Sequence, residues 1–224
     1  MMSIERKISL PAYKLVYAFC FVVILSMIRG ISLSCEIGVA MEAPMAVLAM
    51  VFCADTYTQE IISKRSEIHR LYPLKRRLRS IVLRMVVQEI VLFLFSAAGY
   101  GMFFLFQNPQ SLYKAGQSSE SELHMFLTFL AAMVVTLWFW GMLSNILSCL
   151  SRNMWAGIGC CFVLWLVTNS SFGEKILGSW NLFSYTFRNI TDSGDIRWLC
   201  GKVLCLILCI LMALLMPKLI KKRG

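Results

Sequence analysis

Two glutamates lie inside stretches of the chain that are otherwise apolar. Glu42 falls within residues 37–53 and Glu89 within residues 81–106. A carboxylate at the centre of a membrane costs about 2.5–3.5 kcal/mol on insertion scales, so it should face protein or water rather than lipid. We therefore expect Glu42 and Glu89 to line a translocation path or a dimer interface. The alternatives are a paired structural residue and a neutral carboxylic acid.

A further pair of charges, Arg29 and Glu36, lies where the first two apolar stretches meet, close to Glu42. Ion pairs at that place would close the outer mouth of a helix bundle, so we expect an outer gate there. Plain exposure at the membrane interface is the alternative. Arg84 and Lys202 stand near the ends of apolar stretches, and we expect their long side chains to extend to the polar interface.

Sulfur-bearing residues recur at helical spacing near the end of the chain. These are Cys205, Cys209, Met212 and Met216. Soft sulfur ligands suit cuprous ion, but Cys and Met are also common packing residues, which is the interpretation we favour. No cysteine pair with metal-ligand spacing lies in a polar loop, so no metal site is predicted. Cys35 and Cys200 are expected near the same membrane face and could form a disulfide.

Known catalytic motifs are absent from the sequence. It contains no P-loop, no His-Glu-x-x-His and no Gly-x-Ser-x-Gly. We therefore expect a chain that is not an enzyme, has no catalytic residues and binds no cofactor of its own. Nucleic-acid binding is not expected either, because no loop is long enough to form a folded recognition module.

The composition requires a membrane. Hydrophobic residues make up 58% of the 224 residues and charged residues only 15%, against about 25% charged in soluble domains. We predict an all-α integral membrane protein that forms one domain over residues 1–224. Its spanning helices are expected at residues 15–33, 37–53, 81–106, 123–147, 155–167 and 198–217.

The basic residues predict the orientation. Lys and Arg gather in residues 1–14, in residues 55–80 and after residue 217, and six spans would place these segments on one side. Because cytoplasmic loops carry an excess of Lys and Arg, both termini are expected in the cytoplasm. The small size of the chain favours a bacterial plasma membrane.

Two of the connecting segments are unusual. Residues 55–80 are strongly basic and carry an amphipathic pattern of Ile61, Ile62, Ile68 and Leu71, which favours docking on a partner over a solvated loop. The outer segment, residues 168–196, is too apolar to stand free in water. We expect it to lie on the membrane or to dip into it, like a re-entrant segment.

Three stretches of sequence carry a resemblance to a known family. They are FCADTYTQE with RLYPLKRR (residues 52–60 and 70–77), GMLSNILSCLSR (residues 141–152) and LFSYTF (residues 182–187). Together with the order of spans and loops, they resemble the permease subunits of type-2 ATP-binding-cassette (ABC) transporters. The short segment before the first span departs from many members, which have a longer amphipathic helix there.

The resemblance implies a transport function. Two such permease chains, identical or different, would form a dimer, and separate ATPase chains would bind ATP and magnesium beneath it. Residues 58–72 would form a coupling helix that contacts the ATPase. Its contact residues would be Thr58, Gln59, Glu60, Ile61, Ile62, Lys64, Arg65, Ile68, Arg70, Leu71 and Tyr72. The exported substrate would be amphipathic, such as a peptide, lipid or drug.

Two other classes of function remain open at this point. A carrier driven by an ion gradient would make use of Glu89, although the inverted repeats of such carriers are not evident. A membrane immunity or assembly protein that transports nothing would tolerate the loss of Glu42 and Glu89.

Overall fold

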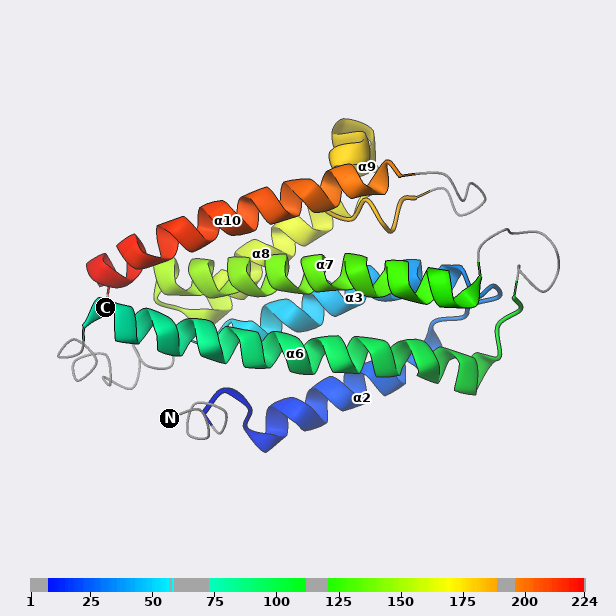
Figure 1. Cartoon of the computed structure of the whole chain (residues 1–224), viewed down its shortest axis with the longest axis horizontal. Helices are drawn as coiled ribbons and strands as arrows, with labels where there is room; N and C mark the ends of the chain where they lie inside the picture. Colours follow the sequence, from blue (N-terminus) through cyan, green and yellow to red (C-terminus); the bar gives the residue numbers. More distant parts are fainter. Residues whose placement is uncertain (1–7, 57, 59–72, 112–120, 189–195, 224) are drawn as a thin grey trace.

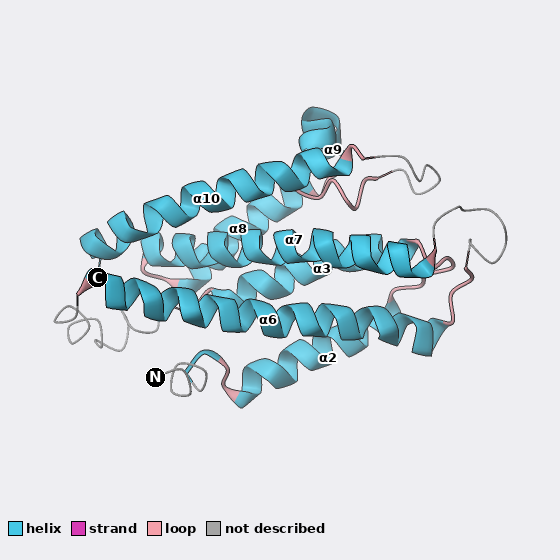
Figure 2. Cartoon of the chain, viewed as in Figure 1, coloured by secondary structure: helices cyan, strands magenta, loops and turns pink. Residues whose placement is uncertain are grey.

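The computed structural model describes residues 8–56, 58, 73–111, 121–188 and 196–223 (Figure 1). Within these ranges all regular elements are helices, and the sole β-type pairing is an isolated bridge between Leu33 and Gln110 (Figure 2). The main helices are α2 (Ala12–Ile28), α3 (Glu36–Cys53), α6 (Leu74–Gln107), α7 (Glu122–Ser151), α8 (Met154–Thr168), α9 (Ser171–Leu177), the 3-10 turn η1 (Gly178–Trp180) and α10 (Trp198–Arg223).

Every predicted span corresponds to a helix, but not all of these helices are long enough to cross a membrane by themselves. In the described residues four qualify by length and hydropathy: α3, α6, α7 and α10. A fifth span is possible if α8 is joined with α9 and η1, although this pair is bent by 73°. Helix α2 is apolar but has only 17 residues. The membrane character predicted from composition is therefore supported, with four or five spanning helices.

Helix α3 lies at the centre of the bundle and packs against α2, α6, α7 and α8. In its most apolar window 72% of the residues are buried inside the protein, compared with 28% in α10. Both helices are apolar on nearly all sides, but the reason differs between them. The side chains of α3 face other helices, whereas much of α10 is left to face lipid.

The turn from α7 to α8 fixes the antiparallel pairing of these helices. Arg152 ends α7 with a positive φ of 54°, and the Asn153 side chain accepts a hydrogen bond from the Trp155 amide at 2.9 Å, which caps α8. Gly157 then lies against Ser148, so close that a Cβ atom would collide with its backbone. This turn lies between residues 147 and 155, the predicted end of the fourth span and the predicted start of the fifth.

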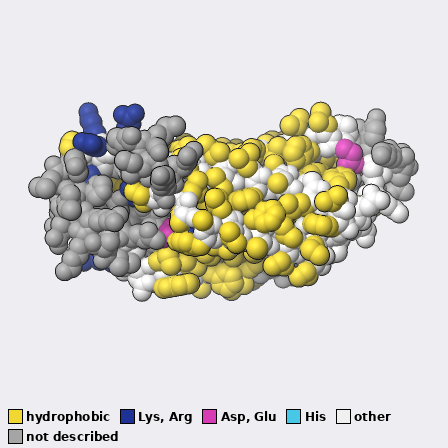
Figure 3. Space-filling view, turned by 90° about the horizontal axis from the view of Figure 1, so that it is seen from below, with side chains coloured by type: hydrophobic (Ala, Val, Ile, Leu, Met, Phe, Trp, Pro, Cys, Tyr) yellow, Lys and Arg dark blue, Asp and Glu magenta, His cyan; other side chains and the backbone are white. Residues whose placement is uncertain are grey.

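The two ends of the bundle differ in charge. Helices α2, α6 and α8 begin at the end where α3, α7 and α10 finish (Figure 1). Exposed cations gather at this end, which we call the basic end: Lys75, Arg76, Arg79, Arg152, Lys218 and Lys221. Figure 3 shows Lys and Arg at that end and apolar side chains over the middle of the visible face. This distribution is compatible with the orientation predicted from the sequence.

The segment after α8 divides its apolar residues between two environments. Phe172, Ile176 and Trp180 are 53–64% exposed, whereas Phe183 and Tyr185 are buried in the bundle. The Phe183 ring stacks on Trp140 with centroids 5.4 Å apart. In the described residues the segment therefore both leaves the bundle at α9 and returns into it.

Candidate functional site: charged residues buried in the bundle

The most strongly bonded charged group in the interior is Glu42 of α3. One of its carboxylate oxygens accepts hydrogen bonds from Lys202 of α10 and, at 3.0 Å, from Thr136 of α7. The other accepts a hydrogen bond from Thr186 at 2.6 Å. Glu42 is 1% exposed and Lys202 is 3% exposed, so both charges are removed from solvent. We call these four residues the Glu42–Lys202 centre.

The remaining donors of Lys202 are also used. Its ammonium donates to the Thr136 hydroxyl at 2.7 Å and to the Leu182 carbonyl at 3.1 Å. The neighbouring Gly201 makes this approach possible, because a Cβ there would collide with Asn181 and Ser184. A buried ion pair is stable only when its lone pairs and protons are satisfied in this way. The centre therefore ties α3, α7, α10 and residues 182–186 together.

This arrangement corrects the prediction for Lys202. Lys202 was expected to extend to the polar interface, but it points into the bundle because Glu42 offers a stronger partner there. Glu36 accepts hydrogen bonds from the backbone amides of Ser32 and Leu33 at 3.2 and 3.3 Å, and Arg29 is exposed. Among the described residues, the ion pair that involves Glu42 is thus with Lys202 and not with Arg29.

A second polar cluster lies near the basic end, where α2, α3 and α6 meet. Lys14 donates hydrogen bonds to the Asp55 carboxylate and, at 2.8 Å, to the Phe52 carbonyl. Beside it, the Thr56 hydroxyl donates to the Gln88 side chain at 2.6 Å. Gln88 in turn donates to the backbone carbonyl of residue 9 at 3.2 Å. We call this set the Lys14–Asp55 cluster.

The sequence did not reveal that this cluster is buried. Lys14 was counted among the loop cations, yet it is 3% exposed, and Arg84 is buried to the same degree although it was expected to extend to the interface. Asp55 stands one turn after Phe52, at the point where the apolar stretch ends. An acidic residue there could have suggested a partner, but not which of the many cations it would be.

Glu89 of α6 occupies a third position, between α3 and α7. Its carboxyl accepts a weak hydrogen bond from the Cys53 thiol at 3.7 Å and lies directly against Gly141, where a Cβ atom would collide with it. The other carboxyl oxygen has no hydrogen-bond partner among the described residues. The same holds for the side-chain amide of Asn145, one turn beyond Gly141 on α7. Glu89 is thus an interior residue, as predicted, but without a cationic partner in the described part of the chain.

The sulfur residues have a packing role. The stripe of Cys205, Cys209, Met212 and Met216 is buried in the bundle, as expected of packing residues. Within the described ranges no three His, Cys, Asp or Glu side chains come together as metal ligands would. Cys35 and Cys200 are free thiols, so the disulfide considered for them is not formed.

The predicted coupling residues lie outside the described residues, apart from Thr58. Its side chain is buried and donates to the Ala54 carbonyl at 3.3 Å. The Thr58 side chain therefore faces the interior of the bundle, just after the end of α3. A contact with a partner would have to come from the residues that follow it.

Buried polar groups occur at three places in the described part of the bundle. They lie at different depths, and each is shared between helices that are far apart in the sequence. Hydroxyl, amide and carboxyl groups in such positions can form or break ion pairs when helices move. No protein-family model matches the chain, and no curated protein is significantly similar to it in sequence.

Proposed function

We propose that the chain is the membrane-spanning permease subunit of an ATP-driven exporter. It would cross the bacterial plasma membrane six times, with α2 as the first span, the joined α8 and α9 as the fifth, and the basic end in the cytoplasm. An amphipathic substrate, such as a peptide, lipid or drug, would be moved between two such permease chains. The energy would come from separate ATPase chains that bind ATP and magnesium.

The observation that carries this proposal is the Lys14–Asp55 cluster. Asp55 and Thr56 begin the predicted coupling loop, and they are bonded to α2 and α6 through buried side chains. Pro73 ends the loop, directly before the 34-residue helix α6. A force applied at Asp55 and Thr56 would therefore act on α2, α3 and α6 at once.

The Glu42–Lys202 centre supports the same function from the opposite half of the bundle. Glu42 lies about 16 Å along the axis of α3 from Cys53, the last residue of this helix, at a rise of 1.5 Å per residue. Movement of α3 at the basic end would therefore shift Glu42 against Lys202 and Thr186. Helix α3 would thus connect the proposed ATPase contact with residues 182–186 at the opposite half of the bundle.

Charge reversal in the proposed coupling loop tests the function. The variant Lys64→Glu with Arg65→Glu should lose the ATPase chain during purification in mild detergent, while the permease still inserts and remains monodisperse. A matched control is Lys218→Glu with Lys221→Glu, which reverses two exposed charges at the same end on α10. Loss of the ATPase in both variants, or in neither, would contradict a specific coupling contact.

A carrier driven by an ion gradient is the second candidate, and Glu89 is the observation in its favour. A buried carboxyl without a cationic partner in the described part of the chain could exchange a proton during transport. Such a carrier would transport in vesicles that contain this chain alone, with no ATP. It would also lose transport in the Glu89→Gln variant.

A further inference from the structure

Exposed cations are concentrated at the start of α6 and at the end of α10. Lys75 and Arg79 stand in the first two turns of α6, and Lys218 and Lys221 stand in the last two turns of α10. All four side chains are exposed. The two helices contact each other, and the start of α6 and the end of α10 both belong to the basic end (Figure 1). We call these four residues the α6–α10 basic patch.

No exposed acidic residue offsets this patch in the described part of the basic end. The acidic residue described there is Asp55, which is 7% exposed and forms an ion pair with Lys14. The first turn of α6 contains no acidic residue. The sequence of residues 59–72 does not reverse the balance, because it has three Lys or Arg residues and two glutamates. The patch is therefore complementary in charge to an anionic partner.

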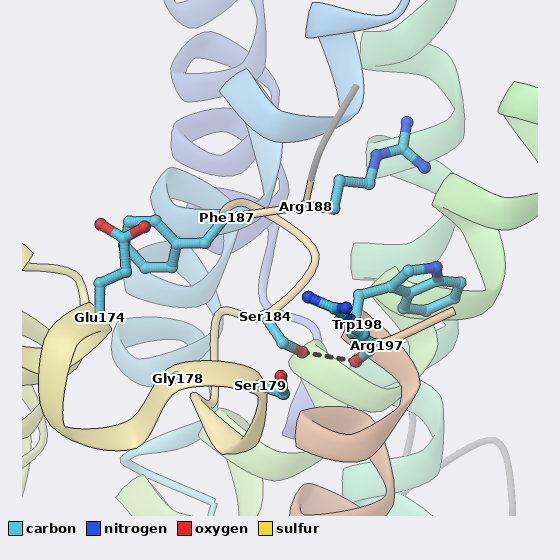
Figure 4. Close-up of a pocket in the computed structure, with 8 residues that line it drawn as sticks. All are labelled: Glu174, Gly178, Ser179, Ser184, Phe187, Arg188, Arg197 and Trp198. Atoms are coloured by element: carbon cyan, nitrogen blue, oxygen red, sulfur yellow. Dashed lines mark hydrogen bonds between the residues drawn. The ribbon is translucent and has the colours of Figure 1, made fainter. Parts of the chain in front are cut away.

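The opposite end of the bundle has charges of both signs. Glu174 and Arg197 line the same cavity of about 370 Å³ there (Figure 4). Lys175 is exposed on α9, but the exposed Glu174 stands directly before it. An anionic partner would therefore prefer the basic end.

The cations of the patch continue rows of apolar side chains that face away from the bundle. Leu214 and Leu215 of α10 are 50–67% exposed, and Lys218 follows Leu214 by one turn. On α6, Arg79 precedes the exposed Val82 by three residues. At 1.5 Å per residue these steps are about 4.5–6 Å, similar to the thickness of one headgroup layer of about 5–7 Å. A partner that presents anions directly beside an apolar phase fits this arrangement.

The length of α6 supports the same placement. Its 34 residues span about 51 Å, whereas the hydrocarbon core of a membrane is about 30 Å thick. Even a tilt of about 40° lengthens the path through the core only to about 39 Å. Part of α6 must therefore extend beyond the hydrocarbon, and its basic first turns are suited to the headgroup layer.

We propose that the α6–α10 basic patch binds anionic phospholipids, such as phosphatidylglycerol, in preference to zwitterionic ones. The lipid phosphates contact the four cations, and the acyl chains lie along the exposed apolar rows of α6 and α10. This binding does not depend on the proposed transport function. It requires neither an ATPase chain nor a substrate, and the patch lies outside the proposed coupling residues.

Native mass spectrometry of the purified full chain in detergent tests the proposal. Phosphatidylglycerol, phosphatidylcholine and soluble glycerol phosphate are titrated separately. We expect phosphatidylglycerol to bind more tightly than phosphatidylcholine, and glycerol phosphate to bind least because it lacks acyl chains. Lys218→Gln with Lys221→Gln should weaken phosphatidylglycerol about 25-fold, or about fivefold for each cation near the membrane surface. The same variant should leave the affinity for phosphatidylcholine unchanged.

Two further variants serve as controls. Lys218→Arg with Lys221→Arg keeps both charges and should retain the affinity for phosphatidylglycerol. Arg29→Gln with Lys175→Gln removes two exposed cations at the opposite end and should also leave this affinity unchanged.

Three results would overturn the proposal. They are equal affinities of the unaltered chain for the two phospholipids, equal effects of the two glutamine pairs, and binding of glycerol phosphate as tight as that of phosphatidylglycerol. If the glutamine pair at Lys218 and Lys221 instead released a co-purifying acidic protein and left phosphatidylglycerol binding unchanged, the patch would be a protein contact, and the lipid site would likewise be wrong.

Discussion

Lys202 and Glu42 form an ion pair in the interior of the bundle, although 160 residues separate them in the sequence. Lys202 stands in the second turn of α10, and Glu42 in the second turn of α3. Thr136 bonds to both of them, and Thr186 binds the second carboxylate oxygen. The centre therefore holds the last helix and the returning segment to the central helix α3.

Removing one partner of this ion pair should destabilise the protein strongly. Glu42→Gln leaves the Lys202 charge buried without a counter-charge, which costs about 3–5 kcal/mol in buried pairs. Unfolding of the purified chain in detergent, followed by circular dichroism, measures the loss. Glu36→Gln is the control, because Glu36 accepts backbone hydrogen bonds near the surface, and it should cost much less. A swap of the two charges in Glu42→Lys with Lys202→Glu should recover part of the stability, and a double variant no better than Glu42→Gln would contradict the pairing.

The same substitution at Glu89 should have a different result. Glu89→Gln keeps the shape of the side chain and leaves no cation among the described residues unpaired, so it should change the free energy of unfolding by less than about 1 kcal/mol. Glu89→Lys should destabilise far more, because it places an ammonium group in the same enclosed site. A loss for Glu89→Gln as large as that for Glu42→Gln would show that Glu89 has an ionic partner.

Two glycines of α8 test the packing of this helix on α7. Gly157→Ala should destabilise the bundle by about 1–3 kcal/mol, since the added methyl group would collide with the backbone of Ser148. Gly159→Ala is the matched control two residues away, where nothing lies within 4 Å of the added methyl group. It should be neutral or slightly stabilising, because Ala is the better helix former. Similar effects of the two variants in thermal unfolding would contradict the close contact between α7 and α8.

Thiol labelling of Cys35 tests the environment at the start of α3. Burial, helped by the nearby Glu36, raises the pKa of the Cys35 thiol above its usual value. The thiolate is the reactive form, so modification by maleimide at pH 7 should be slow. It should accelerate only when the pH rises above the pKa of an ordinary thiol. Labelling is measured by mass spectrometry, with the partly exposed Cys200 as the internal comparison. Faster labelling of Cys35 than of Cys200 at pH 7 would contradict its burial.

Much of the helical framework could be predicted from apolar stretches, and the errors have local causes. The second span was predicted at residues 37–53 and is observed at Glu36–Cys53. The first was predicted to continue to residue 33 but ends at Ile28. The chain beyond it is not helical, because residues 32 and 34 form backbone hydrogen bonds with Gln110 instead. Helix α6 begins earlier than predicted, directly after Pro73, because basic residues can belong to a helix that extends beyond the apolar region.

The polar interior could be predicted only as a list of residues without partners. The cost of an isolated charge in an apolar stretch indicated that Glu42 and Glu89 face protein. It did not indicate that Lys202 would be the ion-pair partner of Glu42, or Lys14 that of Asp55, because these pairings depend on which helices are neighbours. Local spacing carries no information about contacts between residues 14 and 55 or between residues 42 and 202.

The most direct test of the proposed function is to purify the full chain from its native membrane in mild detergent and identify the proteins that accompany it. The account predicts a stoichiometric partner with a P-loop and ATPase activity, together with a second permease chain, identical or different. Recovery of this chain alone across several detergents, with transport activity in vesicles that lack ATP, would contradict an ATP-driven exporter.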